Sequence, residues 1–413
     1  MLERVAGMRV LLTEGSSLTA REVVTCLGPV GHHLEVLDPD RFCLARFSRW
    51  VRRVHRCPPG NTDPLGYVQA LGSVVDARSI EVVLPTHEQA WLLAVTRPLL
   101  SPQVRVAVAT APAFERVQSK VAFVRLLDEL ALPQPDWWLV HDVRDLAGLS
   151  YPYWLKTAFS TAGRGVREVV DDLSRDAALN ALRGDSPLLA QAPAPGQYGQ
   201  VQGLFDHGRL VAVHTSVQRG VGMGGSAAAR LSVDHPAPRE HIRVLGEALR
   251  WHGGLTLDYL HRDGSPQYIE CNPRTVEPGN AAASGVNLPD LQARLTAGEE
   301  LPTLTVGRSG VPTHGAIALL LGAAGRGGSR TLLLGEVSDA VRGRELHASS
   351  QEQLTPVRRD PPSLAAAAFV TARLLVSPGQ AADIADRAVT RYSIGPATVA
   401  EAARAAGAPA PRP

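Results

Sequence analysis

The sequence predicts an α/β fold in the N-terminal part of the chain, followed by a strand-rich α+β region. Short apolar strands alternate with helices over the first 112 residues, which is typical of a parallel sheet with helical crossovers. Residues 135–272 contain several strand patterns, and a turn at Asp263-Gly264 joins the last two. With 413 residues the chain is too long for a single core, so we expect two or three domains.

Residues 1–112 are predicted to form a Rossmann-like domain. The four expected strands are Arg9–Thr13, Leu34–Leu37, Glu81–Leu84 and Val104–Ala109. Helices follow the first and third strands, and Ser16 or Ser17 can cap the first helix. The turn at Glu14–Ser17 lacks the glycine spacing of a dinucleotide-binding loop. The domain therefore carries no signal for NAD.

Residues 113–300 are predicted to form the second domain. A helix over 114–130 contains Lys120 and ends at the prolines that follow it. Another helix spans roughly Pro238–Trp251, and residues 200–234 are rich in strand patterns. The remaining expected strands are Trp137–Val140, Tyr153–Lys156, Leu188–Gln191, Leu255–His261 and Gln267–Asn272.

The C-terminal part of the chain gives weaker signals. Apolar patches near 314–322, 330–340 and 363–376 predict a small mixed α/β region over residues 301–405. Residues 406–413 are rich in Ala and Pro, so we expect a disordered tail there.

Composition argues against several classes of protein. Hydrophobic residues make up 45% of the chain and charged residues 20%, as in a globular protein. The net charge of +2 gives no reason to expect nucleic acid or a membrane as a partner. The four cysteines lack metal-ligand spacing and predict reduced thiols in a cytoplasmic protein. The charged N-terminus does not read as a signal peptide, and the apolar segments are too short to span a bilayer.

Lysine is almost absent from this chain. Of the 42 Lys and Arg residues, only Lys120 and Lys156 are lysines. A lysine is a compact point charge on a flexible stem, whereas Arg is a broad planar fork. The two lysines are therefore candidates for a role that Arg does not fill, and the alternative is that they survive by drift.

The hairpin around Gly264 carries a candidate metal site. If the turn is centred on Gly264, Asp258 lies opposite Glu270, and Asn272 shares the face of Glu270 because side chains alternate along a strand. Directly opposed carboxylates repel each other, but two carboxylates and an amide oxygen suit a hard cation such as Mg²⁺. The alternative is a solvated hairpin whose register keeps the charges apart.

A glycine-containing loop follows the second lysine. Its small residues let backbone N–H groups approach an anion, and Lys156 at the end of the preceding strand adds positive charge. The candidate phosphate contacts in this loop, named here the glycine loop, are Ser160, Thr161, Gly163 and Gly165. An ordinary surface turn is the alternative.

Another glycine-rich segment, Gly220–Gly225, formally matches the GxGxxG pattern. We discount it because a strand pattern follows, so the helix N-terminus that binds pyrophosphate is missing. A mobile loop near the site is the preferred interpretation. Arg219 and Arg230 flank the segment as candidate substrate contacts, with ordinary surface placement as the alternative.

In order and spacing these features resemble the ATP-grasp superfamily, and most closely its carbamoyl-phosphate-synthase-like and biotin-carboxylase-like branch. The resemblance covers about residues 1–300. The stretches that carry it are the helix with Lys120, Tyr153–Lys156 with the glycine loop, Leu257–Tyr259 and Tyr268–Arg274. It implies a two-lobed ATP-grasp fold after the Rossmann-like domain, with the glycine loop in a lobe at about 135–190.

The resemblance also implies a nucleotide site. In the family pattern Lys120 and Lys156 contact the phosphates of ATP, and the glycine loop closes over them. The residues in the place of the adenine hinge are Leu189, Ala190, Gln191 and Ala192. Ala192 departs from the pattern, in which an acidic residue is common, and this leaves the ribose contact open.

Metal and catalytic roles follow from the same resemblance. Asp258, Glu270 and Asn272 would hold Mg²⁺ or Mn²⁺, and Arg274 would steady the transferred phosphoryl group. Glu277 is a candidate base for an incoming amine, and a surface glutamate is the alternative.

The function implied is ATP-dependent ligation of a small-molecule or amino-acid carboxylate to an amine through an acyl phosphate. Many members of the family are homodimers, so a homodimer is also expected here. The alternatives are an ATP-dependent carboxylase or carbamoyl-type enzyme, and a catalytically silent nucleotide-binding protein. The candidate substrate contacts are Glu14, Ser16, His87, Glu88, Arg219 and Arg230.

Overall fold

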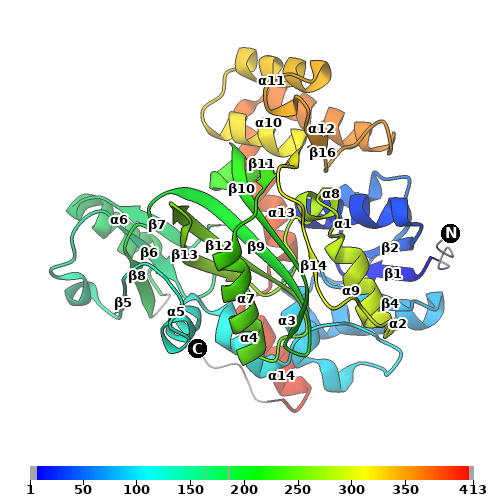
Figure 1. Cartoon of the computed structure of the whole chain (residues 1–413), viewed down its shortest axis with the longest axis horizontal. Helices are drawn as coiled ribbons and strands as arrows, with labels where there is room; N and C mark the ends of the chain where they lie inside the picture. The colour runs from blue at the N-terminus through cyan, green and yellow to red at the C-terminus, as the bar shows by residue number, and fades with distance from the viewer. Residues whose placement is uncertain (1–6, 162, 185–186, 409–413) are drawn as a thin grey trace.

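The computed structural model describes residues 7–161, 163–184 and 187–408. Three sheets organise these residues (Figure 1): a parallel sheet near the N-terminus, a small antiparallel sheet on the opposite side of the molecule, and a large sheet between them. This arrangement confirms the predicted fold class. Of the predicted tail at 406–413, residues 409–413 lie outside the described part of the chain, and the domain boundaries stay a prediction.

The N-terminal sheet is parallel, with the strand order β3-β2-β1-β4. Its strands are β1 (Arg9–Leu12), β2 (His33–Leu37), β3 (Val51–His55) and β4 (Val82–Leu84). The helices beside it are α1 (Leu18–Leu27), α2 (Pro64–Arg78) and α3 (Gln89–Val95). The chain leaves β1 at Glu14 and β4 at Thr86–Glu88. These residues therefore lie at the carboxyl edge of the sheet, where open α/β sheets bind ligands.

Two features of this sheet differ from the prediction. Val104–Ala109 was expected as a strand, but the structure, which describes all six residues, assigns none there. Val83 N–H donates to the Arg105 carbonyl (2.8 Å), a single bond that does not build a ladder. Conversely, β3 was not expected, because its two arginines are exposed and interrupt the apolar pattern. Charged side chains are typical of an edge strand.

The predicted helix over 114–130 is two helices, α4 (Ala111–Gln118) and α5 (Lys120–Glu129). Ser119 separates them because its backbone is extended (φ −81°, ψ 130°), and its hydroxyl caps α5 by accepting from Ala122 N–H. The break makes Lys120 the first residue of a helix and not an interior residue.

The small sheet is antiparallel, with the order β5-β8-β6-β7. Its strands are β5 (Trp137–Val140), β6 (Tyr153–Thr157), β7 (Val166–Val169) and β8 (Leu188–Gln191), and α6 (Asp172–Ala181) packs beside β7. Figure 1 places this lobe at the left of the molecule, away from the N-terminal sheet. The glycine loop joins β6 to β7, and Lys156 pairs with Leu189 of the neighbouring strand β8. The loop, the lysine and the predicted hinge are therefore neighbours.

The large sheet has the order β13-β12-β9-β10-β11-β15-β16, with β14 beside β10. Its strands are β9 (Gln197–Asp206), β10 (Arg209–Val221), β11 (Ala227–Ser232), β12 (Gly253–Arg262), β13 (Ser265–Asn272), β14 (Thr305–Val306), β15 (Pro312–His314) and β16 (Gln351–Glu352). Helix α7 (Pro236–Ala248) packs on β9 and β10 and buries Ile242 and Leu245 against Phe205. The hairpin β12–β13 lies at one edge of the sheet, where α5 contacts β13.

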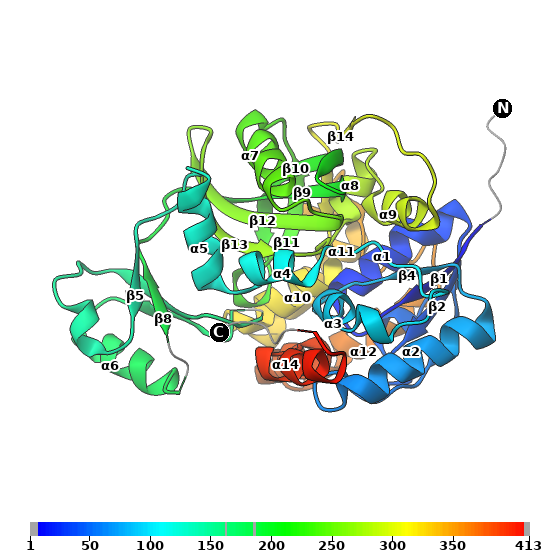
Figure 2. The ribbon, with the colours of Figure 1, turned by 90° about the horizontal axis from the view of Figure 1, so that it is seen from below.

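The rest of the chain is mostly helical. Its helices are α8 (Gly279–Ala283), α9 (Leu288–Ala297), α10 (Ala316–Gly325), α11 (Arg330–Arg342), α12 (Ser363–Val376), α13 (Ala381–Tyr392) and α14 (Pro396–Ala405). Helix α14 packs against α2 and α3 (Figure 2) and buries Val399 and Ala402 there. The C-terminal part of the chain thus returns to the N-terminal domain. Among the helices that the structure describes, none has the length and apolar character that a membrane span needs.

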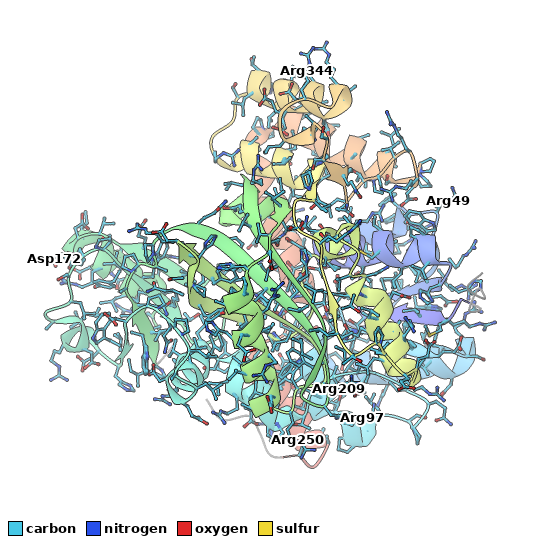
Figure 3. The ribbon with its side chains drawn as sticks, in the orientation of Figure 1. Arg49, Arg97, Asp172, Arg209, Arg250 and Arg344 are labelled. Atoms are coloured by element: carbon cyan, nitrogen blue, oxygen red, sulfur yellow. The ribbon has the colours of Figure 1, made fainter. Side chains whose placement is uncertain are left out.

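Both lysines are buried, unlike several of the arginines. Lys120 and Lys156 have 8% and 7% of their surface exposed. Figure 3 shows labelled arginines at the periphery of the molecule, where all of them are exposed: Arg49, Arg97, Arg209, Arg250 and Arg344. The lysines therefore do not share the general surface role of these arginines.

Candidate active site

The hairpin β12–β13 places Asp258 opposite Glu270, as predicted, but through a different geometry. The turn is a two-residue turn at Asp263 and Gly264, which both have positive φ (51° and 80°). That turn alone would set Asp258 opposite Ile269. A β-bulge directly after Asp258 shifts the register by one residue and brings Glu270 to the opposite position.

The face that Asp258, Glu270 and Asn272 share is rich in oxygen ligands. Asn272 Nδ2 donates to Asp258 Oδ2 (3.0 Å), so the amide oxygen of Asn272 remains as a ligand atom. Gln200 Nε2 (2.9 Å) and the Tyr198 hydroxyl also donate to Asp258. Burial, and next the charge of Glu270, raise the pKa of Asp258 to about 6. The buried carboxylate of Asp258, the half-buried carboxylate of Glu270 opposite it and an amide oxygen fit Mg²⁺ or Mn²⁺, which would relieve their repulsion.

Both lysines lie close to Glu270. Lys120 Nζ is 3.1 Å from Glu270 Oε1 and donates to the backbone oxygen (3.2 Å) and hydroxyl (3.1 Å) of Ser160. Lys156 Nζ donates to Gln191 Oε1 (2.6 Å). Burial lowers the pKa of Lys156 to about 8, although the charge of Glu270 acts to raise it. Two ammonium groups on the same side of the site provide positive charge that an anion such as a phosphate can neutralise.

The glycine loop is tied to two distant parts of the chain. Thr161 Oγ1 donates to Glu88 Oε1 (3.0 Å), which belongs to the turn after β4. Arg164 Nη2 lies 2.6 Å from Asp386 Oδ1 and donates to Thr390 Oγ1 (2.9 Å), both on α13. The loop is therefore held by the N-terminal domain and by a C-terminal helix at once.

The two glycines of this loop are required for different reasons. Gly163 has φ 73°, the left-handed region that favours glycine. A Cβ on Gly165 would lie 2.1 Å from Thr157 Oγ1 and 2.7 Å from Ser160 Cβ. A side chain at Gly165 would therefore displace the start of the loop.

The predicted adenine hinge, Leu189–Ala192, lies at the end of β8. Leu189 and Ala190 are buried, and Ala192 N–H donates to the Asp136 carbonyl (2.8 Å). Gln191 accepts from Lys156, and its Nε2 has no hydrogen-bond partner within the described ranges. Position 192 offers no acidic side chain, so the nucleotide contact of this segment stays a prediction.

Arg274, His87 and Glu88 come together beside the glycine loop. Arg274 Nη2 is 3.5 Å from Glu88 Oε1, and His87 Nδ1 is 2.8 Å from Glu88 Oε2. Burial acts to raise the pKa of Glu88, but His87 and Arg274 outweigh it and lower the pKa to about 2. Glu88 is therefore ionised at neutral pH and holds the Arg274 guanidinium in place. Arg274 Nε has no partner among the residues that the structure describes.

Glu277 and Arg230 form a close ion pair. Arg230 Nη2 donates to Glu277 Oε2 (2.7 Å), and only 6% of the Arg230 surface is exposed. Burial acts to lower the pKa of Arg230, but Glu277 outweighs it. A carboxylate held by a guanidinium is a weak proton acceptor, so this geometry does not favour Glu277 as the base for an amine.

Glu14 and Ser16 organise the turn after β1. Glu14 accepts from Ser16 N–H (2.7 Å), from Ser17 N–H (2.9 Å) and hydroxyl (2.5 Å), and from the Thr86 hydroxyl (2.9 Å). The Ser16 hydroxyl donates to Asp38 Oδ2 (2.9 Å). The Glu14 carboxylate thus uses both of its oxygens inside the protein, and a direct contact with substrate stays a prediction.

Arg219 lies apart from these groups. It is exposed on β10, and no hydrogen bond or ion pair joins it to the other candidates in the described part of the chain. The glycine segment beside it continues into the strand β11, as predicted, and not into a helix.

Three side chains of the site were not predicted. Gln200 and Tyr198 reach Asp258 because β9 pairs with β12, with Gln200 opposite Asp258. Glu22 on α1 accepts from Gly279 N–H (2.7 Å) and lies near Glu277. No local pattern marks these residues, because each joins the site through pairing or packing between distant segments.

Comparison with known proteins finds distant similarity in sequence. No protein-family model matches the chain. The carbamoyl phosphate synthase large chain of Gemmatimonas aurantiaca is 26% identical over 240 residues, which are 54% of this chain and 22% of that protein. Acetyl-CoA carboxylase 1 of Oryza sativa subsp. japonica is 26% identical over 175 residues, 37% of this chain and 7% of that protein. The chain thus spans about a fifth of the synthases it matches.

Solved structures share the fold over most of the chain. N5-carboxyaminoimidazole synthetase from Staphylococcus aureus, complexed with ADP, has a TM-score of 0.61 at 13% identity and covers 85% of this chain and 91% of its own. The biotin carboxylase domain of Hydrogenobacter thermophilus 2-oxoglutarate carboxylase, with MgADP and bicarbonate, has a TM-score of 0.59 at 15% identity. The match covers 73% of this chain and 72% of that domain's chain. L-amino acid ligase from Bacillus licheniformis has a TM-score of 0.54 at 15% identity, and the match covers 71% of this chain and 75% of the ligase. These likenesses establish a common fold.

Proposed function

The chain has the ATP-grasp fold and distant similarity to carbamoyl phosphate synthase large chains, and from this premise we propose that it is an ATP-dependent carboxylate–amine ligase. The observation that supports the proposal most strongly is the oxygen-rich face of Asp258, Glu270 and Asn272 beside the ammonium groups of Lys120 and Lys156. Hard-oxygen ligands next to fixed positive charges match what Mg²⁺ and a triphosphate require.

In the proposed reaction the substrate carboxylate attacks the γ-phosphorus of ATP, the bond to the bridging oxygen breaks, and ADP leaves. The amine nitrogen then attacks the acyl carbon, the bond to the phosphate oxygen breaks, and phosphate leaves. The ammonium loses two protons; phosphate carries one away as the monohydrogen ion, and a base or solvent takes the other. The sum is one amide bond for one ATP.

The residues of the chain act by binding and orientation in this reaction. Lys120 and Lys156 hold phosphate oxygens, and the glycine loop keeps water away from them. Arg274, held by Glu88, faces the transferred phosphoryl group. Mg²⁺, when it is bound by Asp258, Glu270 and Asn272, supplies charge neutralisation. Such positioning and electrostatic stabilisation account for most of the catalysis of phosphoryl transfer.

Carboxylation is the second candidate function. It is supported by the likeness to the Hydrogenobacter biotin carboxylase domain, whose structure contains bicarbonate. In that case bicarbonate would take the place of the carboxylate substrate, with Lys120 and Lys156 in the same roles.

A trapping experiment tests the proposal and separates the two candidates. The protein is incubated with Mg·ATP, hydroxylamine and a panel of carboxylates that includes amino acids and bicarbonate, and both ADP and hydroxamate are measured. We expect at least one organic carboxylate to give hydroxamate and ADP together. Glu270→Gln should lower both by about 100-fold, whereas Glu168→Gln, an exposed glutamate on β7, should lower neither.

Two outcomes would count against the ligase. ADP release that needs bicarbonate and no organic carboxylate would favour the carboxylase. ATP binding without ADP release for any member of the panel would favour a catalytically silent nucleotide-binding protein.

A further inference from the structure

Carboxylates outnumber cations where α1, β11 and the segment after β13 meet. Arg230 of β11 donates through Nη2 to Glu277 (2.7 Å), and Glu22 of α1 lies near the same pair. The charges of both carboxylates therefore act on the same guanidinium, although only Glu277 is in hydrogen-bond contact with it among the described residues. Burial, and next the charge of Glu277, raise the pKa of Glu22 to about 8, so this carboxyl group keeps its proton near neutral pH unless a cation beside it compensates its charge.

The position of Glu22 is fixed by the backbone opposite it. Gly279 N–H donates to Glu22 Oε2 (2.7 Å). A Cβ at Gly279 would lie 2.9 Å from that oxygen and 2.7 Å from Gln353 Cγ. The close approach of the backbone thus holds Oε2 of Glu22, and the carboxylate retains further acceptor capacity. An ammonium group is the partner that such a pair of carboxylates favours.

A second, independent feature lies in the same cluster. Arg230 is buried to more than nine-tenths, yet its Nη1 has no hydrogen-bond partner in the part of the chain that the structure describes. Nη1 belongs to the same planar guanidinium as Nη2, which donates to Glu277. A buried N–H donor of a guanidinium without a partner is costly, and a carboxylate is the anion that its geometry suits.

The cluster adjoins the metal-binding face. The Tyr198 hydroxyl donates to Asp258, and the charge of Arg230 acts on both of these groups. A molecule bound by Glu22, Glu277 and Arg230 would therefore lie next to the place where an acyl phosphate forms.

We propose that the amine substrate is an α-amino acid, with its ammonium group held by Glu22 and Glu277 and its carboxylate by Nη1 of Arg230. This inference rests on the proposed ligase function and names the class of its second substrate. It also assigns Glu22, rather than Glu277, as the carboxylate that can receive a proton from the ammonium before attack, because Glu277 is already engaged by Arg230 at 2.7 Å.

The test compares amines of matched structure. Once the trapping experiment has identified a carboxylate, the common L-amino acids replace hydroxylamine, and amide formation is measured. The best amino acid is then compared with its own carboxamide, which keeps the ammonium group and side chain but lacks the carboxylate. We expect the amino acid to react at least tenfold faster than the carboxamide, and ethylamine to react no faster than the carboxamide.

Variants assign the two ends of the amino acid. Arg230→Gln should bring the ratio of the two rates close to one. Glu22→Gln should lower amide formation more than tenfold relative to hydroxamate formation, since hydroxylamine is neutral and needs no base. Arg344→Gln, an exposed arginine on the far side of the helical region (Figure 3), should leave every ratio unchanged.

The outcomes separate the inference from the function on which it rests. Hydroxamate formation together with equal use of the amino acid and its carboxamide by the unaltered protein would overturn the inference and leave the ligase standing. A failure to form hydroxamate with any carboxylate would remove both. If Arg230→Gln does not fold, the comparison of amines with the unaltered protein decides the question.

Discussion

Lys120 and Lys156 come from different elements but serve the same carboxylate. Lys120 is the first residue of α5, where Ser119 ends the preceding helix, and Lys156 lies on β6. Both are buried beside Glu270, where space and hydrogen-bond acceptors are limited. An arginine carries five N–H donors in a rigid fork and would leave several of them unpaired there. The scarcity of lysine in the sequence thus pointed to two residues that are buried beside the same carboxylate.

The lowered pKa of Lys156 leads to a prediction about nucleotide binding. Because its pKa in the free protein is about 8 instead of 10.5, Lys156 loses its charge as the pH rises through 8. Only the charged form attracts phosphate, so we expect the Kd for Mg·ATP to rise by about tenfold per pH unit above 8. Calorimetric titration with a non-hydrolysable ATP analogue at pH 7, 8 and 9 measures this.

A matched variant provides the control for this prediction. Lys156→Arg stays charged across the range, so its Kd, whatever its value at pH 7, should not rise between pH 8 and 9. A constant Kd in the unaltered protein from pH 7 to 9 would show that Lys156 does not bind the phosphates.

At the scale of the element, the hairpin β12–β13 depends on two local features. The turn needs positive φ at both central residues, and the bulge after Asp258 sets the register that opposes Asp258 and Glu270. The turn and the bulge each shift the register relative to the predicted turn, and the two shifts cancel. The carboxylate pair was therefore predicted correctly from an incorrect turn.

Gly264 gives a prediction that isolates backbone conformation from packing. Its φ is 80°, and a Cβ there would meet no atom within 4 Å. We expect Gly264→Ala to lower the free energy of unfolding by about 1 kcal/mol through strain alone. Denaturant unfolding followed by circular dichroism measures the change.

Gly72 is the control, because a Cβ there also meets no atom within 4 Å, but it lies inside helix α2 with ordinary φ. Gly72→Ala should raise the free energy of unfolding by roughly 0.5–1 kcal/mol, since alanine favours helix. If both variants change stability in the same direction, the strain at Gly264 is not what limits the turn.

At the scale of the whole molecule, the candidate site is assembled from segments that are far apart in the sequence. The glycine loop of the small lobe meets Glu88 of the N-terminal domain and Asp386 of α13. Glu22 of α1 reaches the segment after β13 through Gly279. The site therefore depends on the packing of the N-terminal and C-terminal parts of the chain against each other.

This dependence predicts that α14 stabilises the N-terminal domain. Ala402 is fully buried where α14 packs against α2 and α3. Ala402→Asp would bury an unpaired charge there, so we expect the free energy of unfolding to fall by about 3–5 kcal/mol. Ala397→Asp, in the exposed first turn of the same helix, should change it by less than about 1 kcal/mol. Equal effects of the two substitutions in thermal unfolding would mean that α14 does not pack on the domain as described.

The sequence by itself determined the class of the fold, most of its strands and the candidate residues for phosphate and metal binding. These depend on short-range patterns: apolar alternation, turn residues, the scarcity of lysine and the spacing of Asp258, Glu270 and Asn272 around one turn. The break at Ser119 and the absence of a strand at Val104–Ala109 were not predicted, because capping and pairing override local propensity there.

Only the tertiary structure brought together the cluster that we propose binds the amine substrate. Glu22, Glu277 and Arg230 come from a helix, a loop and a strand that no spacing rule connects, and their contacts exist only when the three segments pack. The same packing uses Glu14 within its own turn and pairs Glu277 with Arg230. Long-range packing sets the charge environment of a side chain, and that environment is the property on which the choice of substrate depends.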